Sequence, residues 1–227
     1  MPLPKERIYT IDDIYALPEG ERAELIDGQI YYMAPPSRKH QEIAGELFTS
    51  INNYIRAAGG SCKPYIAPFA VFLNENDKNY VEPDISVICD PNKLNEKGCV
   101  GAPDWIIEIV SPGSRRMDYN NKLFKYRTAG VREYWIVDPQ KEWIMVYSFF
   151  NDDMNEYSFT DDIPSGIYPG FSLNLSTLNI WTHVCGPTTY SRANSETPIF
   201  SFSQNYKQLR LYSCLLYTSP SPRDKRQ

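Results

Sequence analysis

An acidic side chain lies inside one of the most apolar segments of the chain, Trp-Ile-Ile-Glu-Ile-Val at residues 105–110. Side chains alternate between the two faces of a strand, so Glu108 shares a face with Ile106 and Val110. The segment is too apolar for a strand with one solvated face, and a buried carboxylate is costly to desolvate unless a cation or donors compensate it. Glu108 is therefore either part of a functional site or one half of a structural salt bridge.

A second carboxylate begins the preceding apolar segment. Asp84 follows Pro83 directly and precedes the run Ile-Ser-Val-Ile at residues 85–88. Two carboxylates on successive strands can meet across a sheet, where one divalent ion would neutralise both. Aspartate at a strand start is also a common loop residue, so the spacing alone leaves both interpretations open.

The other residues that commonly bind metals are scarce. The chain has two histidines, His40 and His183, and five cysteines, none of them in a C-x-x-C pair. The odd number of cysteines suggests neither a disulfide framework nor a zinc site, and we interpret them as ordinary thiols. Any metal would be held mainly by carboxylates, which favours Mg²⁺ or Mn²⁺. The cysteines are Cys62, Cys89, Cys99, Cys185 and Cys214.

Charge is distributed unevenly along the chain. The net charge of -5 comprises -9 over residues 1–180 and +4 over residues 181–227. An acidic body opposes bulk capture of nucleic acid, so a nucleic-acid enzyme of this composition needs a local basic rim. One run of cations could form that rim or simply the solvated face of a helix. The run consists of Arg115, Arg116, Lys122, Lys125, Arg127 and Arg132.

Hydrophobic periodicity and turn signals predict an α/β domain with a mixed central sheet flanked by helices. Thr10 should cap a short helix, Asp27-Gly28 should close a hairpin, and Ser37 should begin a long helix that ends at Gly59-Gly60. A later helix is expected over about residues 116–129, ending at Gly130. The predicted strands lie within residues 63–73, 80–89, 104–111, 131–138, 141–150 and 155–160.

The domain is predicted to occupy residues 1–181. Residues 182–227 have neither periodicity nor a coherent apolar face, so we expect a disordered or artefactual tail. Within it, CLLYTSPSPRD at residues 214–224 resembles the translation of a sequencing adapter. The first residues lack the apolar core of a secretory signal, and no apolar run approaches the ~20 residues that span a bilayer. These features predict a cytoplasmic protein without membrane partners.

On a period of 3.6 residues, the helix after Glu108 places Lys122 on the inward side with Tyr119 and Tyr126. Lys125 falls in the other cluster, with Asp118 and Asn121. We therefore expect Lys122 to approach the carboxylates and Lys125 to face solvent or a substrate phosphate. Pairing of Lys122 with Glu108 as a purely structural ion pair is the alternative.

Together these segments resemble the Uma-two family of restriction endonucleases, a branch of the PD-(D/E)XK nuclease superfamily. The resemblance covers about residues 7–180. The segments that carry it are AELIDGQI (23–30), PPSRKHQEI (35–43), VEPDISVICDP (81–91), GAPDWIIEIVSPGS (101–114) and AGVREYWIVDP (129–139).

The resemblance implies a restriction-endonuclease-like fold in which Asp84, Glu108 and the Ile109 carbonyl hold Mg²⁺. In the common superfamily pattern a lysine stands two residues after the glutamate, where this chain has Val110. The resemblance therefore implies that Lys122, on the next helix, takes the role of that lysine.

Two further residues match the family. Glu24 could support the metal through water or be a strand-end carboxylate satisfied by backbone donors. His40 is more simply explained by local capping or packing, and Tyr134 and Trp135 by burial in the core.

We therefore expect a metal-dependent endonuclease that hydrolyses phosphodiester bonds, with DNA as the expected substrate. A non-enzymatic interaction module that keeps the nuclease scaffold is the competing class, and the acidic body favours it. The sequence leaves the oligomeric state open, a homodimer included.

Overall fold

The structure is a computed structural model, and it describes residues 7–74 and 76–178. Its centre is a sheet of six strands in the order β11-β10-β9-β8-β5-β3. Strands β8 and β9 are parallel, and the other neighbours are antiparallel. The strands are β3 (Lys63–Ile66), β5 (Ile85–Ile88), β8 (Trp105–Ile109), β9 (Glu133–Asp138), β10 (Trp143–Ser148) and β11 (Asp153–Ser158).

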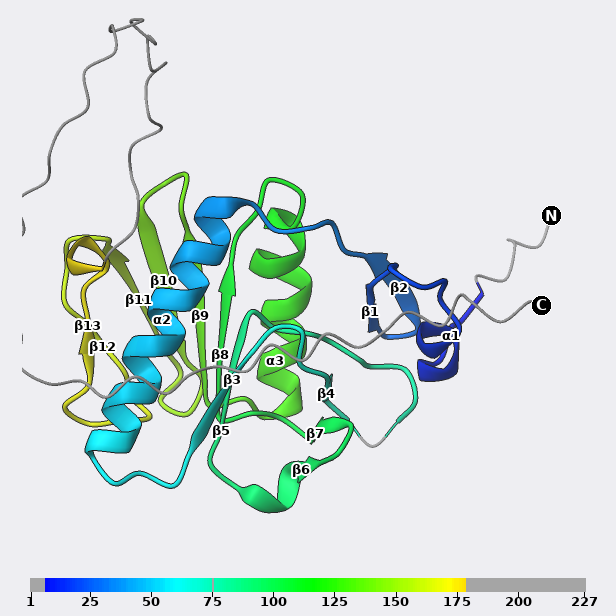
Figure 1. The fold of residues 1–227 in the computed structure, drawn as a ribbon, viewed down its shortest axis with the longest axis horizontal. Helices are drawn as coiled ribbons and strands as arrows, with labels where there is room; N and C mark the ends of the chain where they lie inside the picture. The colour runs from blue at the N-terminus through cyan, green and yellow to red at the C-terminus, as the bar shows by residue number, and fades with distance from the viewer. Residues whose placement is uncertain (1–6, 75, 179–227) are drawn as a thin grey trace, which may run out of the picture. The chain divides into compact units, whose positions relative to one another are not determined.

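Helices cover both faces of this sheet (Figure 1). Helix α2 (Arg38–Ala57) buries Ile43, Leu47 and Ile51 against the face that carries Trp105. On the other face, a helical segment made of η2 (Met117–Lys122) and α3 (Leu123–Ala129) packs against alternate β8 and β9 side chains. The mixed sheet with flanking helices that the sequence predicts is confirmed.

The local signals act as predicted. Thr10 and Asp13 form a capping box at the start of α1 (Ile11–Tyr15). The turn between β1 (Ala23–Ile26) and β2 (Gln29–Tyr32) places Asp27 at φ 51° and Gly28 at φ 78°, which a two-residue hairpin turn favours. The Ser37 side chain accepts a hydrogen bond from the His40 amide and caps α2.

Two segments differ from their predicted form. Residues 63–73 divide into β3 and β4 (Val71–Phe72) around Pro68, which has no amide hydrogen for the ladder. The segment after β5, for which no strand is predicted, contains η1 (Pro91–Lys93), β6 (Leu94–Asn95) and β7 (Gly98–Val100), and β7 pairs with β4. A Cβ on Gly98 would lie 2.2 Å from the Ala70 carbonyl oxygen, so glycine is required for this close approach.

The remaining elements complete the described chain. They are β12 (Ile163–Pro164), β13 (Ser172–Leu173) and η3 (Leu175–Thr177). In the described part of the chain, no helix combines the length and apolar character that a membrane crossing requires. The predicted domain boundary at 181 and the tail at 182–227, with its adapter-like segment, lie outside the described residues.

The interpretation of all cysteines as ordinary thiols is wrong for one pair. Cys62 and Cys89 form a disulfide, while Cys99 is a buried free thiol. Lys63 pairs with Ile88 in the antiparallel register of β3 and β5, so Cys62, just before β3, lies opposite Cys89, just after β5. Cysteine spacing could not reveal this, because the strand register decides it.

Candidate functional site

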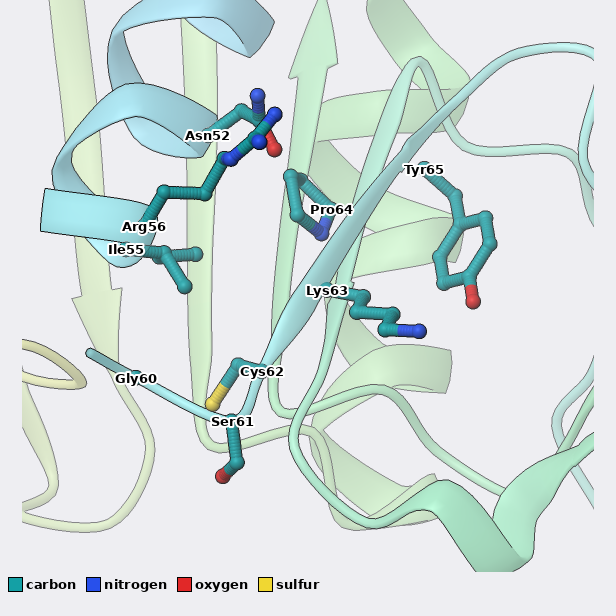
Figure 2. Close-up of a pocket in the computed structure, with 9 residues that line it drawn as sticks. All are labelled: Asn52, Ile55, Arg56, Gly60, Ser61, Cys62, Lys63, Pro64 and Tyr65. Atoms are coloured by element: carbon teal, nitrogen blue, oxygen red, sulfur yellow. The ribbon is translucent and has the colours of Figure 1, made fainter.

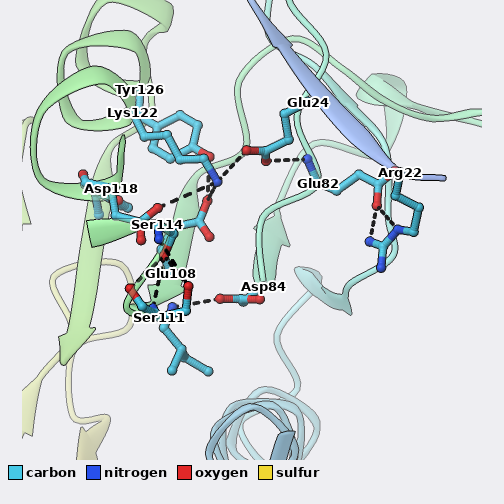
Figure 3. Close-up of polar contacts among 12 residues, drawn as sticks. Arg22, Glu24, Glu82, Asp84, Glu108, Ser111, Ser114, Asp118, Lys122 and Tyr126 are labelled. Atoms are coloured by element: carbon cyan, nitrogen blue, oxygen red, sulfur yellow. Dashed lines mark hydrogen bonds and ion pairs between the residues drawn. The ribbon is translucent and has the colours of Figure 1, made fainter. Parts of the chain in front are cut away.

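Four acidic side chains and one lysine from different elements converge where strand β5 begins and strand β8 ends (Figure 3). Glu24 comes from β1, Asp84 from the residue before β5, and Glu108 from β8. Asp118 and Lys122 lie one helical turn apart in η2. Glu24, Glu108, Asp118 and Lys122 are each 5% exposed or less, and we call these five residues the carboxylate cluster.

Lys122 is the hub of the carboxylate cluster. Its Nζ lies 2.8 Å from Glu24 Oε2, 2.9 Å from Glu108 Oε1 and 3.8 Å from Asp118 Oδ1. Burial works to lower the pKa of Lys122, but these carboxylates outweigh it and hold the pKa well above its ordinary value. Lys122 is therefore an ammonium at neutral pH. The predicted inward orientation of Lys122 is confirmed.

Glu108 is held by two donors. Its Oε1 accepts the bond from Lys122 Nζ and a second one, at 2.6 Å, from the hydroxyl of Tyr126. Desolvation raises the pKa of Glu108 well above its ordinary value, and the Lys122 charge opposes this rise only in part. Its position on the face with Ile106 and Val110 is as predicted.

The two carboxylate oxygens of Glu24 have different partners. Its Oε1 accepts a hydrogen bond of 3.0 Å from the Glu82 amide, as a strand-end carboxylate would. Its Oε2 faces Lys122, so Glu24 also belongs to the carboxylate cluster.

Asp84 is held from two sides. Its Oδ2 accepts hydrogen bonds from the Ile109 amide at 2.7 Å and from His40 Nε2 at 3.1 Å. Burial works to lower the pKa of His40, but the hydrogen bond and charge of Asp84 raise it above its ordinary value. Local capping therefore explains only the backbone amide of His40. The contact of its ring with Asp84, 44 residues away in the chain, is not predicted from the sequence.

The prediction that Asp118 and Lys125 lie on an outer face is wrong. Both residues are buried, and Lys125 pairs with Asp27 in the β1–β2 turn. A helix turns about 100° per residue, so Lys125 lies only about 60° around the axis from Lys122. The β1–β2 hairpin covers the side of the helix that carries Lys125. Residues 117–122 also form a π-helix, whose wider turn a 3.6-residue period does not anticipate.

The predicted basic rim is largely neutralised. Besides Lys122 and Lys125, Arg115 pairs with Asp138, Arg127 with Asp152 and Arg132 with Asp104. Of the six cations in the run, only Arg116 has no ion pair among the residues that the structure describes. The run therefore makes neither a free basic rim nor a simple solvated face.

The carboxylate cluster suits a hard divalent cation. Three carboxylates share one lysine, a fourth, Asp84, belongs to the same cluster, and burial raises the pKa values of Glu108 and Asp118. Within the described residues no three His, Cys, Asp or Glu side chains form a ready ligand set. Mg²⁺ does not require one, because it commonly keeps several waters and binds one or two carboxylates. Asp84 and Glu108 fit that pattern.

Replacing Asp118 with asparagine should change the pH dependence of stability. Burial raises the pKa of Asp118 to about 6 from an ordinary 3.8, so the folded state binds this proton more tightly than the unfolded state. Its contribution is fully present below about pH 4 and is lost as the pH rises through about 6. Between about pH 4 and 7, Asp118→Asn should gain up to about 3 kcal/mol of unfolding free energy relative to wild type. Chemical unfolding with a chelator present measures this, and parallel pH profiles would refute it.

A separate cavity of about 320 Å³ lies between the end of α2 and strand β3 (Figure 2). Asn52, Arg56 and Lys63 contribute its polar lining. Lys63 pairs with Ile88 at the end of β5 remote from Asp84, so this cavity is distinct from the carboxylate cluster.

The comparisons with known proteins agree with this architecture. The crystal structure of "a putative nuclease belonging to DUF820" from Anabaena variabilis has a TM-score of 0.61 to this chain. Its identity is 22%, over 74% of this chain and 95% of that one, which establishes a shared fold. The fold class is thus that of this nuclease-like protein, and the predicted restriction-endonuclease-like architecture is confirmed.

The family follows from the sequence matches. The model of the Uma2 family, described as "Putative restriction endonuclease", matches residues 11–176, and the chain belongs to this family. An uncharacterized protein of Synechocystis, slr1290, is 31% identical over 136 residues, which is 60% of this chain and 70% of that protein. The resemblance stated from the sequence is confirmed.

Proposed function

We propose that this protein is a Mg²⁺- or Mn²⁺-dependent endonuclease that hydrolyses phosphodiester bonds, with DNA as the substrate. The observation that carries the proposal is a buried lysine shared by carboxylates, next to Asp84, which accepts a hydrogen bond from the residue after Glu108. Membership of a family described as restriction endonucleases supports the same chemistry.

Asp84 and Glu108 would hold the cation, with Glu24 supporting the site from β1. When bound, such an ion polarises a phosphoryl oxygen, lowers the pKa of bound water and stabilises the leaving oxygen. Lys122 would supply a fixed positive charge and a hydrogen-bond donor beside the reacting phosphate. Because its pKa is raised, Lys122 would orient the attacking water and not accept its proton.

The second candidate is a non-enzymatic interaction module. Lys122 already has three carboxylate neighbours, so the carboxylate cluster can persist as a structural ion network. The neutralised basic run also leaves little positive charge there to attract a nucleic-acid backbone.

Cleavage of a mixture of DNA and RNA by the full-length protein separates the two candidates. We expect cleavage of DNA with Mn²⁺ or Mg²⁺ and none with a chelator, because two carboxylates and a lysine do not replace the cation. Products resolved on denaturing gels report both the substrate and the metal requirement. Equal cleavage with and without the chelator would show an activity that does not use the proposed metal site. No cleavage with either metal would favour the interaction module.

A further inference from the structure

Both donors to Glu108 bind the same oxygen. Lys122 Nζ and the Tyr126 hydroxyl both donate to Oε1, at 2.9 and 2.6 Å. Within residues 7–74 and 76–178, no donor is hydrogen-bonded to Glu108 Oε2. A carboxylate held by two donors on one oxygen cannot rotate without breaking both bonds, so its second oxygen has a fixed direction.

The donors to Asp84 also bind only one of its two carboxylate oxygens. His40 Nε2 and the Ile109 amide both donate to Oδ2, and no described residue donates to Oδ1. His40 Nδ1 is buried without a hydrogen-bond partner among the described residues. A proton on Nδ1 would be a buried unsatisfied donor, so the network assigns the proton to Nε2, directed at Asp84.

Resting on the proposed metal site, we propose that Tyr126 and His40 are positioning residues for the two metal-binding carboxylates. Each fixes one oxygen and leaves the other, Glu108 Oε2 or Asp84 Oδ1, to the divalent cation. Neither residue needs to touch the cation or the substrate. Partners that orient ligands in this way typically change metal affinity by about 10- to 100-fold when removed.

The surroundings of Tyr126 suit a positioning role. Its side chain is fully buried, and its ring packs edge-on against Tyr134 with ring centroids 5.0 Å apart. A tyrosine hydroxyl keeps its proton at neutral pH, so Tyr126 is the donor in its contact with Glu108 Oε1. The ring position is thus set by the core, and only the hydroxyl reaches the carboxylate.

Tyr134 supplies a matched control. It is an equally buried tyrosine in the same core, but its hydroxyl donates to the backbone oxygen of Asp118, at 3.1 Å, and not to a carboxylate. Tyr126→Phe and Tyr134→Phe therefore delete the same atom from neighbouring positions. Only the first deletion releases a candidate ligand.

The test is Mn²⁺ binding to the full-length protein at about pH 8, measured from the paramagnetic resonance of free Mn²⁺. We expect Tyr126→Phe and His40→Phe to raise the Kd for Mn²⁺ on the order of 10-fold. Tyr134→Phe should leave the Kd unchanged, although its melting temperature falls as that of Tyr126→Phe does. The His40→Phe arm provides a second readout if Tyr126→Phe does not fold.

Two results would overturn the inference, and they are distinguishable. If Tyr126→Phe and His40→Phe bind Mn²⁺ as tightly as Tyr134→Phe and wild type, both residues are only structural. If wild type binds Mn²⁺ no better than Glu108→Gln, the proposed metal site itself is wrong, and the positioning roles are wrong with it.

Discussion

Replacing Lys122 with methionine is expected to remove most of the cleavage activity and to lower the unfolding free energy by about 3 to 5 kcal/mol. Methionine approximates the length of the lysine stem but removes the charge shared by Glu24, Glu108 and Asp118. These buried carboxylates would be left facing each other without a cation. Loss of a positioned catalytic group should also slow turnover by on the order of 100-fold or more.

Lys125→Met is the matched control for Lys122→Met. Lys125 is similarly buried and lies on the same helical segment, but its partner Asp27 has a side chain that is 66% exposed. Solvent compensates Asp27 when the lysine is lost, so the expected loss of stability is smaller and cleavage should persist. Chemical unfolding and cleavage rates with excess Mn²⁺ measure both effects. Retained cleavage in Lys122→Met, with loss in Lys125→Met, would reverse the assignment.

The central residues of the candidate site could be predicted because each is a charged side chain next to or inside an apolar segment. Glu108 is conspicuous as the one charge in an apolar strand, and its face follows from the two-residue period. Asp84 directly precedes the buried strand β5. The strand that carries Glu108, β8, pairs with β5 in the central sheet. The 3.6-residue period of the next helix then places Lys122 on the inward side.

The rest depends on tertiary contacts that no local pattern contains. The His40 ring reaches Asp84 only because α2 crosses the sheet there. Lys125 is buried only because the β1–β2 turn packs on its flank of the helix. The hydroxyl of Tyr126 is likewise indistinguishable, in sequence, from any inward aromatic side chain.

Glu108→Gln is expected to abolish the stabilisation that Mn²⁺ gives the wild-type protein. A ligand that binds only the folded state at about 100 times its Kd stabilises it by about 2.7 kcal/mol, and the neutral amide would be a much weaker ligand. Thermal unfolding with and without excess Mn²⁺ measures this difference. Glu156→Gln, on the exposed edge strand β11, should keep the full shift. An equal shift in Glu108→Gln and wild type would place the metal elsewhere.

The most direct test of the proposed active site is DNA cleavage by wild type and Glu108→Gln, purified identically and assayed side by side with Mn²⁺. The proposed mechanism predicts that wild type cleaves and that Glu108→Gln is slower by on the order of 100-fold or more, while Glu156→Gln retains the wild-type rate. Equal cleavage by Glu108→Gln and wild type would contradict it, because the activity would then arise from another site or another protein.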